Sequence, residues 1–201
     1  MNNRIHQILD QISALENELH TAIEQEGGRL RYQLEGKRVT FERTIKEAHL
    51  KVRVGVLRWF LTVRPQNFLT APIIYGMIFP LVLFDLFVTF YQATCFPIYR
   101  IAKVRRANYI VMDHQHLAYL NIIEKVDCMY CSYAVGLLGY ASEITARTEQ
   151  YFCPIKHARK ILGANSRYKK FLSYGDADDL HDKVEEFRAA LAREDGSDIT
   201  R

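Results

Sequence analysis

Three of the four cysteines lie in one stretch of the 201-residue chain, CMYCSYAVGLLGYASEITARTEQYFCPIKH, which begins at Cys128. Cys128 and Cys131 form a C-x-x-C pair, and Cys153 lies four residues before His157. Together the two pairs supply three thiolates and one imidazole, a tetrahedral set common in structural zinc sites. The spacing therefore predicts zinc bound by these four residues.

The same ligands allow two other interpretations. Cys153-Pro154 is similar to the cysteine-proline pairs found beside iron–sulfur clusters, so iron or an iron–sulfur cluster is the alternative cofactor. A C-x-x-C pair without metal can also be redox active. If four protein ligands close on zinc, no position remains for water or substrate, which favours a structural role over catalysis.

A straight helix between the two pairs would keep this site open. A rise of about 1.5 Å per residue separates Cys131 from Cys153 by about 33 Å, whereas two sulfurs on one metal lie about 4 Å apart. Three arrangements would close the site: a break at Gly136 or Gly139, a return of the chain after Cys153, or a second subunit. The two glycines weaken a helix, each by up to about 1 kcal/mol, and so permit the break.

A second metal site is predicted from His116 and Glu143. If residues 115–127 and 133–151 form a helical hairpin, the two side chains approach each other as a carboxylate–histidine pair. The sequence favours a surface or capping pair for His114 and His116, so this metal site is the lesser candidate. The chain has no Gly-rich phosphate loop, nucleophile elbow or H-E-x-x-H motif, so the sequence favours a non-enzymatic protein.

The elements that would position these residues surround an apolar segment, residues 67–99. It contains no Lys or Arg, and its only acid is Asp85. A spanning helix needs about 20 apolar residues, so the segment is predicted to be intramembrane; a buried core helix is the alternative. Asp85 would need a turn, water or a partner group there.

The segment is predicted to be a re-entrant hairpin rather than a single span. Pro72, Gly76 and Pro80 interrupt its first half. Lys and Arg flank both ends, as on the cytoplasmic side of a membrane, which places both termini in the cytoplasm. The residues predicted to contact lipid are Arg58, Trp59, Arg64, Arg100, Lys103, Arg105 and Arg106.

Apolar periodicity predicts helices in the rest of the chain. Residues 1–26 show heptad spacing, which indicates oligomerisation. Residues 29–64 show an eleven-residue apolar repeat with a basic face, predicted to be an interfacial helix on anionic lipid; a soluble coiled-coil arm is the alternative. Residues 107–172 are predicted to form the cytoplasmic helical domain that holds the metal, and residues 176–194 an amphipathic helix.

The chain resembles an uncharacterised family of bacterial inner-membrane-associated proteins. The resemblance rests on APIIYGMIFPL, CFPIYR, YCSYAVGLLGYASEITARTEQYFCPIKHAR and RYKKFLSYGDA, across about residues 50–178. It implies a bacterial inner-membrane location and no particular activity. The basic stretch KHARKILGANSRYKKF has no nucleic-acid recognition motif around it, so lipid is the favoured anion.

Taken together, the sequence predicts an all-α membrane-associated protein with a small metal-clasped C-terminal domain. The expected function is a membrane-anchored, metal-binding, oligomeric scaffold or an accessory subunit of a larger bacterial membrane complex. The alternative is a membrane-bound iron-dependent redox protein or metalloenzyme.

Overall fold

The computed structural model describes most of the chain between residues 55 and 194. It describes residues 32–35, 38–41, 55–62, 64–159, 161–176, 178 and 180–194, with scattered positions before residue 54. The described chain is mostly helical, as predicted. It divides into two compact units, residues 1–62 with 113–126 and residues 63–112 with 127–201.

The first unit contains a β-hairpin where a helix was predicted. Strands β1 (Tyr32–Glu35) and β2 (Arg38–Phe41) pair antiparallel, so the helix predicted over residues 29–64 is wrong there. The physical reason is local, because apolar residues alternate with polar ones along both strands: Tyr32, Leu34, Val39 and Phe41. Helix α3 (Val56–Thr62) follows.

The predicted heptad helix over residues 1–26 lies mostly outside the described residues. The positions described within it are helical, and Leu15 and Leu19 are exposed there. The oligomerisation that the heptads indicate stays a prediction.

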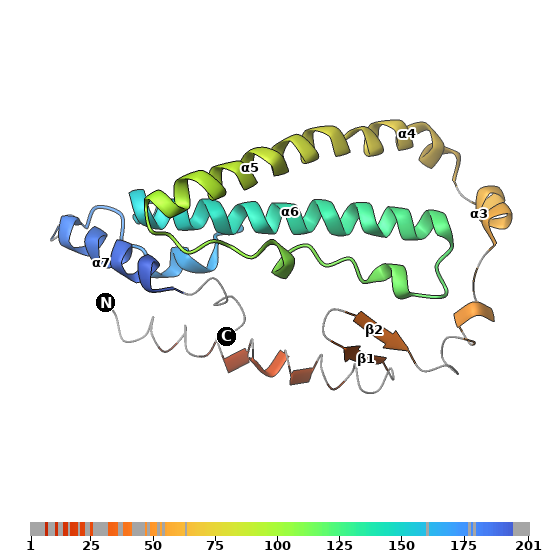
Figure 1. Ribbon diagram of the computed structural model, residues 1–201, viewed down its shortest axis with the longest axis horizontal. Helices are drawn as coiled ribbons and strands as arrows, with labels where there is room; N and C mark the ends of the chain where they lie inside the picture. The colour runs from red at the N-terminus through yellow and green to blue at the C-terminus, as the bar shows by residue number, and fades with distance from the viewer. Residues whose placement is uncertain are drawn as a thin grey trace. The chain divides into compact units, whose positions relative to one another are not determined.

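In the second unit the apolar segment forms one long rod. Helix α4 (Pro65–Gly76) is followed end to end by α5 (Ile78–Ile98), as Figure 1 shows. The predicted re-entrant hairpin is therefore wrong. Pro80 has no N–H to donate to the carbonyl of Gly76, four residues earlier, and this missing bond coincides with the boundary at Met77 without reversing the chain.

Helix α6 (Ile122–Phe152) runs beside this rod in the same direction. Contacts at its start join Tyr130 to Ile74, and contacts near its end join Thr148 to Tyr91. Residues 101–112, here called the return segment, run back alongside α6 and include the short 3-10 helix η1 (Arg106–Asn108).

The start of α6 is fixed by a capping box. The side chain of Asn121 accepts the backbone N–H groups of Ile123 and Glu124, each at 3.0 Å. The Glu124 carboxylate in turn accepts the N–H of Asn121 at 2.8 Å.

Helix α6 is not broken at Gly136 or Gly139, so the first of the three arrangements that would close the zinc site does not occur. A Cβ on Gly136 would lie 2.5 Å from the carbonyl oxygen of Tyr109 and 2.9 Å from the Cα of Ile110. The glycine therefore permits the return segment to cross α6 in close contact, rather than ending the helix.

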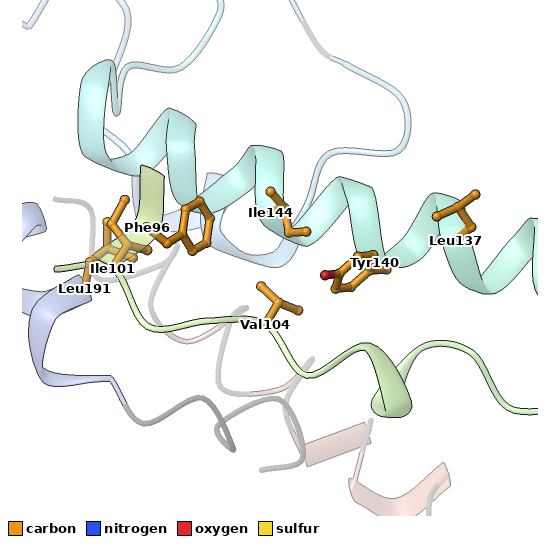
Figure 2. Packing of buried hydrophobic residues seen from close by; sticks show 7 residues of the cluster. All are labelled: Phe96, Ile101, Val104, Leu137, Tyr140, Ile144 and Leu191. Carbon is orange, nitrogen blue, oxygen red and sulfur yellow. The ribbon is translucent and has the colours of Figure 1, made fainter. Parts of the chain in front are cut away.

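The C-terminal elements complete the core. They are the 3-10 helix η3 (Ser166–Lys170) and helix α7 (Leu180–Arg193), with an isolated parallel bridge between Ile155 and Leu172. Figure 2 shows the buried cluster that α5, the return segment, α6 and α7 share. Its members are Phe96, Ile101, Val104, Leu137, Tyr140, Ile144 and Leu191.

Candidate functional site

The four predicted zinc ligands lie at opposite ends of α6. Cys128 and Cys131 are in its first turns, and Cys153 follows its last residue. The continuous helix separates Cys131 from Cys153 by about 33 Å. No group of three or more His, Cys, Asp or Glu side chains that could hold a metal occurs among the described residues.

The chain after Cys153 does not return to the C-x-x-C pair. The N–H of Lys156 donates to the carbonyl of Leu172 at 2.7 Å, and that of His157 donates to the Tyr168 hydroxyl at 2.6 Å. The His157 ring stacks on Tyr168 with ring centroids 6.3 Å apart. Of the three predicted arrangements, only a second subunit is left to close the site, and the metal itself stays a prediction.

The predicted pairing of His116 with Glu143 required a helical hairpin that the structure does not contain. Glu143 is instead occupied by two guanidinium groups, Nε of Arg147 at 2.9 Å and Nε of Arg167 at 2.8 Å. His116 belongs to the 3-10 helix η2 (His114–His116), where its N–H donates to the carbonyl of Asp113.

Asp85, the one acid of the apolar rod, faces the rest of the second unit. Arg106 of the return segment forms an ion pair with it. The hydroxyl of Tyr133 donates to its second oxygen at 2.8 Å, and that of Thr89 to its first at 3.3 Å. The partner group that the sequence required for this carboxylate is therefore supplied by the same chain.

Gln92, two turns further along α5, faces the same side. Its amide oxygen accepts the N–H of Val104 at 2.7 Å, and its amide nitrogen reaches the Val104 carbonyl at 3.3 Å and the Tyr140 hydroxyl at 2.9 Å. The bonds to Val104 supply hydrogen-bond partners for its backbone N–H and carbonyl, which a helix or sheet would otherwise provide.

The opposite side of the rod is apolar and exposed. Phe79 is 77% exposed and Leu86 67%, whereas Asp85 is only 8% exposed. The exposed apolar residues of this outer face are Leu69, Ile73, Ile74, Phe79, Val82, Leu83, Phe84, Leu86, Phe87 and Phe90. The rod, residues 65–98, is the one helix among the described residues that is long and apolar enough to cross a membrane.

A second polar cluster joins α6 to the C-terminal elements. Arg147 is fully buried and donates to Glu143 and, at 2.6 Å, to the carbonyl of Ala102. Arg167 holds Glu194 through two bonds of 2.8 and 2.6 Å. Burial alone would raise the pKa of Glu194, but the bonds and charge of Arg167 outweigh it and hold that pKa below its usual value.

The residues predicted to contact lipid differ in exposure and in their contacts. Arg64, Arg100, Lys103 and Arg105 are exposed around the two ends of the rod. Arg106 instead pairs with Asp85, although its side chain stays 43% exposed. Arg58 is exposed and Trp59 half-buried in α3 of the first unit.

The sequence reasoning missed most of the buried cluster. Glu143 and Arg147 are spaced i, i+4 in a helix, a signal that was present. Arg167 lies in η3 and Glu194 follows the last residue of α7, and no local pattern connects them.

Comparison with known proteins finds no counterpart for this arrangement: no protein-family model, no curated protein and no solved structure matches the chain. The resemblance to a bacterial membrane-associated family stays a prediction.

Proposed function

We propose that this protein is a membrane-surface scaffold whose α4–α5 rod lies in the plane of the bilayer. The observation that carries the proposal is the distribution of polarity on α5. Asp85 and Gln92 point into the protein, while the outer face is apolar. Polar groups turned inward and apolar groups turned outward are expected of a helix that faces lipid.

The neighbours of the rod favour an in-plane position over a span. A rod of 34 residues is about 51 Å long, well above the roughly 30 Å of a hydrocarbon core. A span would also carry the return segment, with Lys103 and Arg105 exposed, to the depth of the bilayer. Non-helical backbone and charge are poorly tolerated there.

Basic residues at the rod ends fit an anionic surface. Arg64 lies before α4, and Arg100, Lys103 and Arg105 follow α5. Each such residue near an anionic surface contributes about 1 kcal/mol to binding. The proposed setting is the cytoplasmic face of a bacterial inner membrane, where the protein acts as an oligomer or as an accessory subunit of a larger complex.

Depth-dependent quenching of tryptophan fluorescence tests this position. Phe79 lies close to the middle of the rod, so Phe79→Trp in a Trp59→Phe background reports the depth of that point. Lipids brominated near the headgroup end of the acyl chain should quench it most, because an in-plane helix enters only about 5–10 Å.

Glu186→Trp, on the exposed face of α7, is the matched control and should not be quenched. Strongest quenching of Phe79→Trp by bromine at the bilayer centre would indicate a span and would overturn the in-plane position. No quenching by any lipid would overturn membrane insertion altogether.

A further inference from the structure

One face of α6 is exposed along the middle of the helix. Its residues at helical spacing are Cys131, Val135, Leu138, Ser142 and Thr145, called here the α6 stripe. Val135 is 71% exposed and Leu138 57%. The other sides of α6 are covered by α5 and by the return segment, through Tyr133 and Gly136 respectively.

Cys131 begins this stripe, and Cys153 lies about two turns beyond its last residue, Thr145. Cys131 and Cys153 are both exposed and are separated by 22 residues of sequence, about six helical turns, so they fall on the same face of the helix axis. Ser142 lies halfway, about three turns from each. A twofold axis through Ser142 would therefore bring Cys131 of one copy to Cys153 of the other.

We propose that two copies of this chain pair antiparallel along the α6 stripe and close two equivalent zinc sites. In each site Cys128 and Cys131 of one protomer meet Cys153 and His157 of the partner subunit. The geometry requires helices that cross at a small angle, about 20°, so that they stay close over several turns.

The charges near the two ends of α6 favour a second copy of this chain as the partner. Asp127 lies beside the C-x-x-C pair, and Lys156 and Arg159 lie beside Cys153. Antiparallel pairing places Asp127 of one copy toward Lys156 and Arg159 of the partner subunit, which follow the end of α6, with the helix dipoles opposed. Parallel pairing would place like charges together.

The pairing deepens the proposed function and rests on it in one respect. Two helices that lie in the membrane plane become antiparallel under a twofold axis normal to that plane, whereas two spanning helices become parallel. An in-plane rod therefore gives α6 the direction that the clasp needs.

The chemistry of the site is closed. One Zn²⁺ displaces a proton from each of the three thiols to solvent, and the neutral imidazole contributes its unprotonated nitrogen. Four protein ligands leave no position for substrate. The clasp would thus hold two protomers together and supply no reaction.

Zinc analysis of heterodimers tests the clasp. The full-length protein is purified in detergent without metal-affinity resin. Wild type should carry about one zinc per chain, and Cys131→Ser or Cys153→Ser alone almost none. The matched control, Cys95→Ser in α5, should keep its zinc.

The decisive sample co-expresses Cys131→Ser and Cys153→Ser with two different tags. The isolated heterodimer contains one intact site and should recover about half a zinc per chain. No recovery in a folded heterodimer, or full zinc in either single variant, would overturn the proposal. So would zinc-free wild type.

Disulfide cross-linking tests the antiparallel pairing without the Cys131→Ser and Cys153→Ser variants. Ser142→Cys should form a disulfide with its own copy under mild oxidation, because it lies on the axis. Leu162→Cys, 88% exposed in the loop after α6, should not. A Ser142→Cys protein that stays uncross-linked would contradict the antiparallel pair, whereas the quenching experiment above reports on membrane position alone.

Discussion

Helices α5 and α7 belong to the same unit and have opposite polarity. On α7 the apolar residues, including the fully buried Leu191, face inward, and the charged Asp182, Glu185 and Glu186 face outward. On α5 Asp85 and Gln92 face inward and the apolar residues outward. Since both helices pack on the same core, the difference lies in what their outer faces contact.

The proposed membrane position accounts for this difference, because it gives the two helices different surroundings. The outer face of α7 suits water, and that of α5 suits lipid. The buried polar groups in the core between α5 and α7 form hydrogen bonds and ion pairs with neighbouring elements. These bonds avoid the free-energy cost of a buried polar group without a partner. Four substitutions test how far this contrast holds.

The largest expected effect comes from the buried charge cluster. Arg147→Met removes a fully buried guanidinium and leaves the carboxylates of Glu143 and Glu194 with one cation. Breaking a buried ion pair typically costs about 3–5 kcal/mol of unfolding free energy. Denaturant unfolding in detergent measures this.

Its matched control is Arg188→Met on α7, where the guanidinium stacks on Tyr151 and its side chain is 33% exposed. A half-exposed pair is worth about 1 kcal/mol or less. Equal losses for the two variants would show that the interior polar cluster is not a distinct contribution to stability.

The next effect concerns the two outer faces directly. Phe87→Lys places a charge on the apolar face of α5, where Phe87 is 63% exposed. A charge moved into hydrocarbon costs about 2–3 kcal/mol, so vesicle binding should weaken by about 30–150-fold.

Glu186→Lys introduces the same side chain on the outer face of α7 and should leave binding unchanged or slightly tighter on anionic vesicles. Sedimentation with phosphatidylglycerol-containing vesicles measures both. If the two variants bind alike, the polarity contrast does not reflect lipid contact.

A smaller effect is expected where α6 meets the return segment. Gly136→Ala forces a methyl group against the backbone of Tyr109 and Ile110. Overpacking of this kind costs about 1–3 kcal/mol. Gly55→Ala, with no atom within 4 Å of its added Cβ, is the control and should retain its melting temperature; a stable Gly136→Ala protein would argue against the close crossing.

The smallest effect is on pH dependence. Because the folded pKa of Glu194 is lowered, its contribution is present above the ordinary carboxyl pKa of 4.5 and is lost as pH falls through the folded pKa. Wild type should therefore lose more stability between about pH 5 and about pH 3 than Glu194→Gln. If the unfolding free energies of the two proteins change with pH in parallel, the ion pair of Glu194 does not contribute to stability.

Much of the helical fold was readable from sequence because apolar residues recur at helical spacing. The apolar segment, the single acid within it and the need for a partner to Asp85 were all visible. The sequence could not show whether the chain reverses within the apolar segment or continues straight. Pro72 and Pro80 allow either a hairpin or a slightly interrupted rod, and only packing against α6 selects the rod.

The glycines of α6 illustrate the same limit. Gly136 and Gly139 suggest a break in the helix because glycine lowers helix propensity. In the structure, Gly136 instead makes room for the backbone of Tyr109 and Ile110, which crosses α6 there. The β-hairpin was missed because Leu34 and Phe41 fit both an eleven-residue helical repeat and the alternation of strands. Glu143 lies on the same helix as Arg147, but its other partners, Ala102 of the return segment and Glu194 after α7, are distant in sequence and no local pattern could reveal them.

The most direct measurement of the central claim is thiol labelling at the two ends of the rod. In a background with all four native cysteines changed to serine, Arg64→Cys and Arg100→Cys are treated separately with a membrane-impermeant maleimide. An in-plane rod on the cytoplasmic face predicts that both are labelled in inside-out inner-membrane vesicles and neither in intact spheroplasts. Labelling of one position in vesicles and the other in spheroplasts would mean that the rod crosses the membrane, and would contradict the account.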